Sequence, residues 1–544
     1  MDQDLAAVAP NPGGALCNRP LSRGGAELAD CVRRLYAEGQ TDYAIEPLVL
    51  VDGYGQPVGR IADEDAVIFC CRRGEREIEL TEAFTEASFP HFPRPAFRHL
   101  PFVILTLYHE KFKDLPVAFL PTRIPDTLGE VISRAGLRQL HVSESEKFAH
   151  ITFFLNGGQH QPFPGEVDVS LPSPKGIPFD QVPALSLPQV AAQVIEGLRR
   201  GYDLIAANFA NGDVLGHTAS RDAKLQCAAR VDMHLARVVE AASASGYVTL
   251  ITADHGNLET LWNEDGTPHV AHTSNPVACI LVDPLRQAPL HLRDGKLADV
   301  APTILSALGV AQPSAMDGVS LVPGAAWGGK RKALLLILDG WGIGTQDETN
   351  PIYAAPTPYW DDLLQRHPSS RLQAFGEAVG LQAGKAGNSE AGHLNLGAGR
   401  VVLQDDVRLD LALQDGSFYT NETFQRVMQD VIGRKSSLHL IALLSERSSH
   451  GSIAYPLALL RMAKACGVRQ VYVHVIFDGR STEPGTAPAL LEKLEAEMHT
   501  IGLGQIVSGI GRGIALDRDG NYAKIQRTFE ALVFGQGRKV SAAV

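Results

Sequence analysis

The alternation of short apolar runs with amphipathic stretches constrains the fold of this chain more than any other feature of its sequence. From about Leu120 onward, helical patterns such as EVISRAG, QVAAQVIEGLRRG and LARVVEAASASG alternate with the apolar runs HITFFLNGG (150–158), YDLIAANF, YVTLIT and VACILV. This rhythm is typical of α/β proteins with a largely parallel sheet. We therefore predict an α/β fold, with the apolar runs as strands and the helices covering the sheet.

The same pattern returns after a break in the second half of the chain. Residues 322–332, VPGAAWGGKRK, are rich in Gly and Pro and end in basic residues, which is typical of an exposed linker. The runs LLLILDGWG, LHLIALLS and QVYVHVIFDGR then continue the α/β pattern. Near the start, we expect a disordered arm over 1–25, a helix over 26–39 and a strand over 65–71. A chain of 544 residues has room for two or three ordinary domains.

The composition argues against several classes of protein. Hydrophobic residues make up 45% of the sequence and charged residues 20%, as in globular proteins, and no apolar run approaches the roughly 18 to 20 residues that span a bilayer. The net charge of −12 argues against nucleic-acid binding. The seven cysteines show no C-x-x-C spacing, and acidic residues stand where a secretory signal would have basic ones. We therefore expect a cytoplasmic protein with reduced thiols.

Three apolar runs end in side chains that can bind a metal. In α/β sheets the ligand site lies outside the carboxyl ends of the strands. The candidate ligands from LLLILDG, VTLITADHGN, YDLIAANFANGDVLGHT and the further stretch TPHVAHTSNP are Asp339, Asp254, His255, Asp213, His217, His269 and His272. Mixed carboxylate and imidazole ligands suit Mn²⁺ or Zn²⁺ better than Mg²⁺ or Ca²⁺. Taken singly, an aspartate at a strand end is more often a helix cap or a turn residue.

Ser389 is the candidate nucleophile. It lies in KAGNSEAGHLNLGAGR (385–400), among small residues at the expected start of a helix. Glycines allow close approach of a phosphate, and a helix N-terminus favours anions. A divalent cation would lower the pKa of the serine hydroxyl and make it a nucleophile. The alternative is that Ser389 only caps the helix.

Five motifs together resemble a known family. They are D-G-W-G after an aliphatic strand, G-N-S-E-x-G-H, N-F-A-N-x-D-x-x-G-H-T, T-A-D-H-G-N and A-H-T-x-N-P. In combination they are similar to the cofactor-independent (2,3-bisphosphoglycerate-independent) phosphoglycerate mutases of the alkaline phosphatase superfamily. The resemblance covers nearly all of the chain except the first ~25 residues and the 322–332 linker.

The resemblance implies an isomerase that interconverts 3-phosphoglycerate and 2-phosphoglycerate, a step of glycolysis and gluconeogenesis. It implies two divalent cations, Mn²⁺ first, with Zn²⁺, Co²⁺ or Mg²⁺ as alternatives. The ligands of one would be Asp213, His217 and His272, and those of the other Asp339, Ser389, Asp254 and His255. Ser389 would carry the phosphoryl group as a phosphoserine. We expect a monomer whose partner is a small-molecule substrate, with neither nucleic acid nor membrane.

The order of the motifs differs from that of the family, where the D-G-W-G strand lies near the N-terminus. A circular permutation explains this order, with the old termini joined through the 322–332 linker. It implies an alkaline-phosphatase-like, metal-binding domain over 121–404, with a mostly parallel sheet flanked by helices. A second α/β phosphotransferase (lid) domain would consist of 26–120 plus 405–544.

The resemblance also implies a set of substrate-binding residues. Arginines suit a phosphate and a carboxylate because their donors are forked. The matching positions are His450, Arg480, Ser481, Arg512, Arg518, Arg73, Arg76 and Lys147. Without the resemblance, most of these residues would be interpreted as solvated surface charges.

Three departures from the family pattern fall in this set. DGRSTEP replaces D-G-R-D-T-x-P, FCCRRG replaces an F-N-F-R-P-like segment, and SSHGS replaces V-H-S-H. Ser481 thus stands in place of an acid, and we hypothesise that Glu483 or a water held by Ser481 takes over its role.

The alternatives to a phosphoglycerate mutase are a metal-dependent phosphomonoesterase, a mutase for another small phosphorylated acid, and a catalytically silent phosphometabolite-binding homologue.

Overall fold

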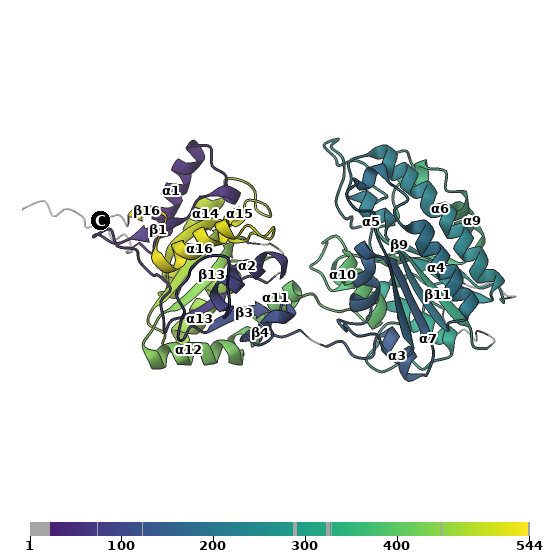
Figure 1. Ribbon diagram of the computed structural model, residues 1–544, viewed down its shortest axis with the longest axis horizontal. Coiled ribbons are helices and arrows are strands. Elements are labelled where there is room, and N and C mark those ends of the chain that lie inside the picture. Colours follow the sequence, from purple (N-terminus) through teal and green to yellow (C-terminus); the bar gives the residue numbers. More distant parts are fainter. Residues whose placement is uncertain are drawn as a thin grey trace, which may run out of the picture. The chain divides into compact units, whose positions relative to one another are not determined.

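The computed structural model describes residues 22–72, 74–121, 123–286, 291–322, 327, 329–446, 448 and 450–541. The chain forms two compact units (Figure 1). Unit 2 is the continuous segment Thr122–Arg408, and unit 1 combines the residues up to Pro121 with Leu409–Val544. Within the described part of the chain, no helix is long and apolar enough to cross a bilayer.

Unit 2 contains an eight-stranded, mostly parallel sheet in the order β10-β12-β9-β8-β11-β7-β5-β6. Among the strand pairs of the described residues in this sheet, β8–β9 and β9–β12 are antiparallel and the others are parallel. The strands are β5 (Gln139–Glu144), β6 (Glu166–Leu171), β7 (Leu204–Phe209), β8 (Tyr247–Thr252), β9 (Val277–Val282), β10 (Gly295–Lys296), β11 (Lys332–Leu338) and β12 (Ser369–Gln373). The central strands are buried along their whole length, as their continuous apolar sequences require.

Helices cover both faces of this sheet (Figure 1). They are α3 (Leu128–Arg134), α4 (Leu187–Arg200), α5 (Asn211–Gly216), α6 (Arg221–Ala244), α7 (Val300–Leu308), α8 (Pro351–Ala354), α9 (Pro358–Arg366) and α10 (Ser389–Ala398). Helix α11 (Asp405–Asp415) crosses the boundary between the units. A single hydrophobic core runs through unit 2, so this unit has the core of an independent domain.

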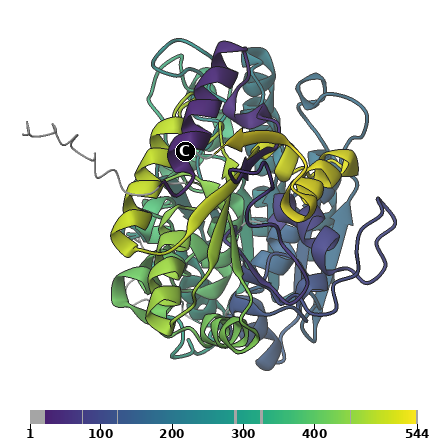
Figure 2. The ribbon, with the colours of Figure 1, turned by 90° about the vertical axis from the view of Figure 1, so that its left-hand side faces the viewer.

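Unit 1 contains a second eight-stranded sheet, in the order β16-β1-β15-β14-β13-β2-β3-β4, with one antiparallel pair, β1–β15. Its strands are β1 (Leu48–Val51), β2 (Ala66–Phe69), β3 (Phe102–Thr106), β4 (Val117–Phe119), β13 (Leu438–Leu444), β14 (Val471–Phe477), β15 (Gln505–Gly511) and β16 (Arg538–Ser541). Strands from both ends of the chain therefore belong to one sheet, and the purple β1 lies beside the yellow β16 (Figure 2).

Two hydrophobic cores lie on opposite faces of the sheet in unit 1. Alternate residues of β13 belong to different cores, because side chains of a strand point to opposite faces in turn. One core includes α1 (Gly25–Ala37), α12 (Glu422–Arg434), α13 (Ala454–Cys466) and α14 (Ala487–Ile501). The other includes α2 (Gly74–Thr85), α15 (Arg512–Ala515) and α16 (Tyr522–Phe534). The predicted class, two mostly parallel α/β sheets with helices, is confirmed.

Two local expectations are wrong. Residues 150–158 do not form a strand, since His150–Phe154 is a π-helical turn that ends before Gly157 and Gly158, both at positive φ. A short apolar run has the same composition in a buried helical turn as in a strand. The 322–332 segment is not exposed throughout: Val322 and Trp327 are buried, and Lys332 already begins β11. Of the expected arm, residues 1–21 lie outside the described residues, and α1 begins at Gly25.

Candidate metal centre

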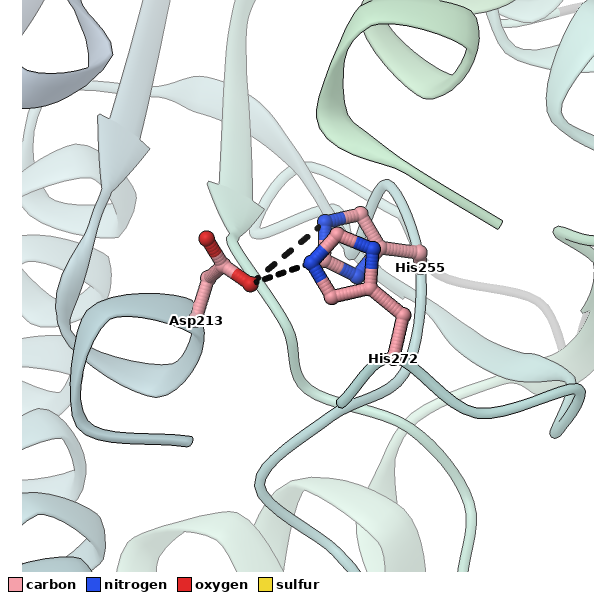
Figure 3. A group of neighbouring side chains, drawn as sticks. All are labelled: Asp213, His255 and His272. Atoms are coloured by element: carbon pink, nitrogen blue, oxygen red, sulfur yellow. Dashed lines mark ion pairs between the residues drawn. The ribbon is translucent and has the colours of Figure 1, made fainter. Parts of the chain in front are cut away.

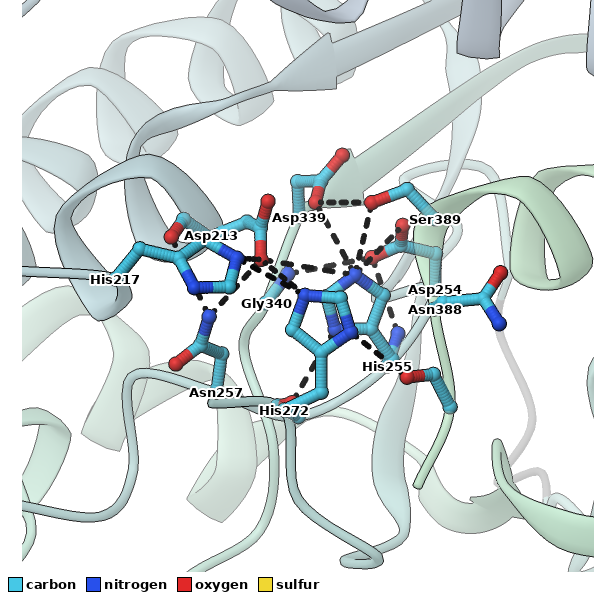
Figure 4. A network of polar contacts seen from close by, with 12 residues as sticks. Asp213, His217, Asp254, His255, Asn257, His272, Asp339, Gly340, Asn388 and Ser389 are labelled. Atoms are coloured by element: carbon cyan, nitrogen blue, oxygen red, sulfur yellow. Dashed lines mark hydrogen bonds and ion pairs between the residues drawn. The ribbon is translucent and has the colours of Figure 1, made fainter. Parts of the chain in front are cut away.

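Three adjacent parallel strands, β7, β11 and β8, deliver polar side chains to one edge of the sheet in unit 2. Asp339 directly follows β11, and Asp254 with His255 follows β8. Asp213 lies in α5, the short helix after β7. Because the carboxyl ends of parallel strands meet at the same edge, these side chains converge, together with Ser389 at the start of α10 (Figure 4).

Two glycines permit this convergence. Gly340 has a φ of +71°, and a Cβ at this position would lie 2.6 Å from the Asp213 nitrogen. A Cβ at Gly212 would lie 2.4 Å from the Asp339 carbonyl oxygen. The chain after β11 therefore packs directly on the start of α5, which brings the two aspartates together.

The first group of candidate ligands surrounds the Asp213 carboxylate (Figure 3). Asp213 Oδ1 lies 3.0 Å from His272 Nε2, 3.3 Å from His217 Nε2 and 3.8 Å from His255 Nε2. Carbonyl groups fix the other nitrogens of two rings, since His272 Nδ1 lies 2.8 Å from the Gly387 oxygen and His217 Nδ1 2.9 Å from the Val270 oxygen. Both Nε2 atoms thus face the carboxylate, as in metal sites with oriented imidazoles.

The second group contains Asp254, His255 and Asp339, all fully buried. His255 Nε2 lies 3.4 Å from Asp254 Oδ2 and 3.6 Å from Asp339 Oδ1. Ser389 Oγ completes this group, at 2.9 Å from His255 Nε2 and 3.3 Å from Asp339 Oδ1. All seven residues that the resemblance implies as metal ligands therefore lie in one cluster.

Lys147 lies between the two groups. Its ammonium donates hydrogen bonds to Asp213 Oδ2 (2.7 Å), Asp339 Oδ1 (2.8 Å) and Ser389 Oγ (2.6 Å). Burial disfavours the charged form of the lysine, but Asp339 and Asp213 outweigh burial and raise its pKa. The lysine is therefore a buried cation beside the candidate nucleophile.

The charges of the cluster fit a divalent cation. The cluster brings three buried aspartates close to the single ammonium of Lys147, and none of the described residues donates a hydrogen bond to Asp254 Oδ2. Burial, followed by the nearby Asp254 charge, raises the pKa of Asp339. Burial also opposes ionisation of Asp213, but Lys147 and hydrogen bonds from His217 and His272 lower its pKa well below the usual value. Uncompensated buried carboxylates of this kind are paired or bind metals.

Asn208 and His393 support the ligands and were not identified from the sequence. Asn208 Nδ2 donates to Asp339 Oδ2 (2.6 Å) and lies 2.9 Å from His393 Nε2. His393 Nδ1 lies 3.2 Å from Asp254 Oδ2. His393 is the last residue of the G-N-S-E-x-G-H motif, so its place in this motif could have identified it from the sequence. Asn208 lies inside an apolar strand, where no pattern singles it out.

Several predicted substrate-binding residues lie at the carboxyl ends of adjacent parallel strands in unit 1. His450 follows β13, Ser481 follows β14 and Arg512 follows β15. Buried Arg512 forms an ion pair with Asp478, whose Oδ2 accepts from the Ser481 nitrogen (3.1 Å). His450 Nδ1 lies 3.1 Å from Glu77 Oε1.

The remaining predicted residues of unit 1 lie in different environments. Arg76 is buried and donates to the Leu516 carbonyl oxygen (3.0 Å), whereas Arg480 and Arg518 are exposed. Arg73 lies outside the described residues. Arg72, which was not identified from the sequence, is buried, and its guanidinium donates to the Ser448 carbonyl oxygen (2.6 Å).

Comparison with known proteins decides the family. The sequence profile of the Metalloenzyme superfamily matches residues 25–312, more than half of the chain. The chain belongs to the Metalloenzyme superfamily. A second profile, described as the N-terminus of BPG-independent PGAM (iPGM_N), matches residues 409–544 of this superfamily member. Membership of the Metalloenzyme superfamily and the two groups of ligands together indicate divalent-metal binding in unit 2.

Curated relatives of this superfamily member carry a common name. This chain is 45% identical over 297 residues to the 2,3-bisphosphoglycerate-independent phosphoglycerate mutase of Syntrophotalea carbinolica. The alignment covers 54% of this chain and 57% of the relative. This chain is 43% identical over 305 residues to the 2,3-bisphosphoglycerate-independent phosphoglycerate mutase 2 of Methanosarcina acetivorans. This alignment covers 56% of this chain and 58% of the relative. The chain thus matches under three-fifths of the length of these relatives. Crystal structures of Leishmania mexicana phosphoglycerate mutase at low cobalt concentration match half of the chain (50%, and 53% of that chain), at 27% identity and a TM-score of 0.40.

Proposed function

We propose that this protein interconverts 3-phosphoglycerate and 2-phosphoglycerate through a phosphoserine on Ser389, without bisphosphoglycerate. The observation that carries the proposal is the position of Ser389 Oγ, within 3.3 Å of Lys147, His255 and Asp339 inside the buried cluster. The shared name of the curated relatives supports the choice of substrate. In this proposal the protein acts in glycolysis and gluconeogenesis, in the cytoplasm, as a monomer.

In this proposal the protein binds two Mn²⁺ ions. The ligands around Asp213 would hold one, and those around Asp254 and Asp339 would hold the other. The ions would lower the pKa of the serine hydroxyl and offset the negative charge of the phosphoryl group. Ser389 Oγ attacks phosphorus, its bond to phosphorus forms, and the bond from phosphorus to the glycerate oxygen breaks. The serine proton leaves with that oxygen, so free glycerate results. Glycerate then turns, and its other hydroxyl takes the phosphoryl group while Ser389 regains a proton.

Lys147 has two tasks in this reaction. Its ammonium donates to Ser389 Oγ and therefore orients the hydroxyl toward the incoming phosphorus. Because it also donates to Asp213 and Asp339, it links the two groups of ligands and keeps its charge near the phosphoryl oxygens.

Unit 1 would supply the lid and the carboxylate-binding residues. The polar residues at the ends of β13, β14 and β15, with His450 and Arg512 among them, support a role in holding glycerate between the two transfers. A closed lid keeps glycerate in and water out, which favours return of the phosphoryl group over hydrolysis.

We also propose that the chain is a circular permutation of the family order. The support is the position of the profile matches, since the profile described as the N-terminus matches residues 409–544. A permutation also explains why a single alignment covers only 54–56% of this chain. In this proposal, β11, which ends just before Asp339, corresponds to the first strand of the family order, and residues 322–332 join the termini of that order.

The test is an enolase-coupled assay on the purified protein, with Mn²⁺ and without bisphosphoglycerate. We expect turnover that chelator abolishes and that Ser389→Ala reduces roughly a thousandfold or more. Ser369→Ala, at an exposed serine of β12, is the matched control and should leave turnover unchanged. A rate that survives Ser389→Ala or ignores chelator would exclude this mechanism.

A metal-dependent phosphomonoesterase is the second candidate, and Ser481 is the observation that favours it. Its hydroxyl accepts from Ser448 Oγ (3.1 Å), and serine is no general base near neutral pH. Exposed Glu483 is our proposed replacement, so Glu483→Gln should lower kcat by about 10²-fold or more. An unchanged kcat would leave the water held by Ser481 as the base. Release of free phosphate in place of 2-phosphoglycerate would instead identify a phosphomonoesterase.

A further inference from the structure

A second cluster of metal-ligating side chains lies in unit 2 and uses none of the residues around Ser389. It consists of His141 on β5 and of Glu166 and Asp168 on β6, the edge strand of the sheet. The two strands are parallel, and His141 is paired in register with Asp168. Glu166 and Asp168 are two residues apart on one strand, so both point to the same face as His141.

The ligand atoms of these three residues lie within 4.8 Å of one another. His141 Nδ1 is 3.3 Å from Glu166 Oε1 and 3.7 Å from Asp168 Oδ1. His141 is fully buried, yet neither of its ring nitrogens makes a hydrogen bond to any residue that the structure describes, and neither does Asp168 Oδ1. Because an unsatisfied buried polar group is costly, the arrangement calls for a further partner among these atoms.

Neighbouring amides hold the Glu166 carboxylate in place. Asn156 Nδ2 donates to Glu166 Oε1 (2.7 Å), and the Phe163 nitrogen donates to Oε2 (3.2 Å). Gln139 Nε2 lies 3.4 Å from the same Oε2 and is itself fixed by the Gly129 carbonyl oxygen (2.8 Å). Carboxylate ligands of metals are commonly oriented by outer hydrogen bonds of this kind.

The electrostatics of the cluster also fit a cation. Within the described residues, no lysine or arginine forms an ion pair with Glu166 or Asp168. Burial raises the pKa of Glu166, and it raises the pKa of Asp168 to about 6. Burial lowers the pKa of His141 to about 4 and thus favours its neutral form, against the effect of the nearby Asp168 charge. A neutral imidazole is the form that binds a metal.

We propose that His141, Glu166 and Asp168 form a third divalent-cation site, selective for Zn²⁺, that fastens the edge strand β6 to β5. One imidazole and two carboxylates provide three ligands whose atoms lie within 4.8 Å of one another, and a water supplies the fourth. Asp168, whose side chain is 16% exposed, gives the ion access from solvent. The role is structural, since binding only to the folded chain stabilises that fold.

The test compares the full-length protein with His141→Ala, Asp168→Asn and the control Asp180→Asn, an exposed aspartate of unit 2. Each protein is equilibrated with Zn²⁺, and its bound metal is counted by mass spectrometry after gel filtration. We expect the wild type and Asp180→Asn to hold one more Zn²⁺ per chain than either site variant. We also expect added Zn²⁺ to raise the Tm of the wild type more than that of Asp168→Asn, which keeps all buried apolar contacts.

The same comparison in an Asp339→Asn background separates this site from the proposed catalytic one. We expect the Asp339→Asn protein to hold one more Zn²⁺ per chain than the Asp339→Asn, Asp168→Asn double variant. This difference should be seen whether or not mutase activity is lost. Equal Zn²⁺ counts in the wild type and both site variants would overturn the proposal, because Glu166 and Asp168 would then share a proton without an ion. When Zn²⁺ and Mn²⁺ are supplied at equal concentration, Mn²⁺ bound at this site in place of Zn²⁺ would overturn the stated selectivity.

Discussion

At the scale of single residues, the candidate metal centre depends on side chains that are not themselves ligands. Asn208 is fully buried, and its amide holds Asp339 from one side and His393 from the other. His393 in turn contacts Asp254. Asn208 thus orients Asp339 by a hydrogen bond, and His393 extends the contacts to Asp254, the second aspartate of the same ligand group. We expect these two residues to affect metal affinity as strongly as some ligands do.

We predict that Asn208→Ala lowers the Mn²⁺ affinity of the protein about 10- to 100-fold, because Asp339 loses the hydrogen bond that orients it. Isothermal titration with Mn²⁺ measures this change. The control is Asn350→Ala, which removes the N-cap of α8 and should cost about 1 kcal/mol of stability while leaving the affinity unchanged. Equal Mn²⁺ affinity in both variants and the wild type would contradict the prediction.

Glu77 provides a pH-dependent prediction for unit 1. Burial raises the pKa of this carboxyl from its ordinary value of 4.5 to about 8, and its Oε1 lies 3.1 Å from His450 Nδ1. A raised pKa means that the folded chain binds the proton more tightly than the unfolded chain does. The contribution of Glu77 to stability is therefore complete below pH 4.5 and is lost as the pH rises through about 8.

We expect Glu77→Gln to remove this loss. Chemical denaturation at several pH values between 4.5 and 8 should show a smaller fall in the free energy of unfolding for the variant than for the wild type. Glu483→Gln, at an exposed glutamate of the same unit, should follow the wild-type curve. Parallel curves for all three proteins would show that Glu77 ionises normally in the folded state.

Positions at strand ends could be identified from the sequence, and positions inside strands could not. Asp213, Asp254 and Asp339 each follow an apolar run, so parallel strands were enough to predict that they meet. Asn208 is hidden within such a run. The place of Lys147 depends on the 3-10 turn after β5, and β5 alternates polar and apolar residues although it is fully buried. Its polar side chains therefore concealed this strand.

At the scale of elements, α10 is held against the end of β8 by a glycine. A Cβ on Gly392 would lie 2.5 Å from the Asp254 carbonyl oxygen and 2.7 Å from its Cβ. Both atoms belong to a fully buried residue that follows a buried strand. The helix that begins with Ser389 therefore cannot carry a side chain at this position without moving away from Asp254.

We predict that Gly392→Ala lowers kcat at least about 10²-fold and weakens metal binding, because a shift of about 1 Å displaces Ser389 from the aspartates. Gly433→Ala in α12 is the matched control. No heavy atom lies within 4 Å of a Cβ there, so this variant should keep its activity and gain about 0.4–1 kcal/mol. Metal titration and the coupled assay measure both effects, and a fully active Gly392→Ala would show that α10 adjusts.

The strands β7, β8, β9, β11, β13 and β14 could be predicted from the sequence, since all six lie in apolar runs. The error at 150–158 has a physical cause. Its residues ITFFL are apolar and partly β-branched, and only the surrounding packing decides between a strand and a helical turn. Strand order is equally invisible locally, because β2 reaches its neighbour β13 across most of the chain.

At the scale of the whole molecule, the two units differ in continuity. Unit 2 is one segment with one core. In unit 1, β1 lies between β15 and β16, and β2 lies between β13 and β3. Neither part of unit 1 can complete the sheet without the other.

We predict that the fragment 122–408 folds alone, unfolds in a single transition and binds Mn²⁺, but lacks mutase activity because it has neither His450 nor Arg512. The fragment 409–544 should not fold alone, and adding 22–121 should restore its structure. Circular dichroism and thermal melts measure both outcomes. A cooperative transition of 409–544 by itself would contradict the second half of this prediction.

The sheet of unit 1 combines strands made early with strands made late, and this has a consequence for biosynthesis. When β1 and β2 leave the ribosome, the late strands that flank them have not been translated, namely β15 and β16 beside β1 and β13 beside β2. All of Thr122–Arg408 must be made first. At about 5–20 residues per second, this takes roughly 15 to 60 seconds. During that time β1 and the β13-facing edge of β2 have no strand to pair with, so we expect a chaperone to shield them in the cell.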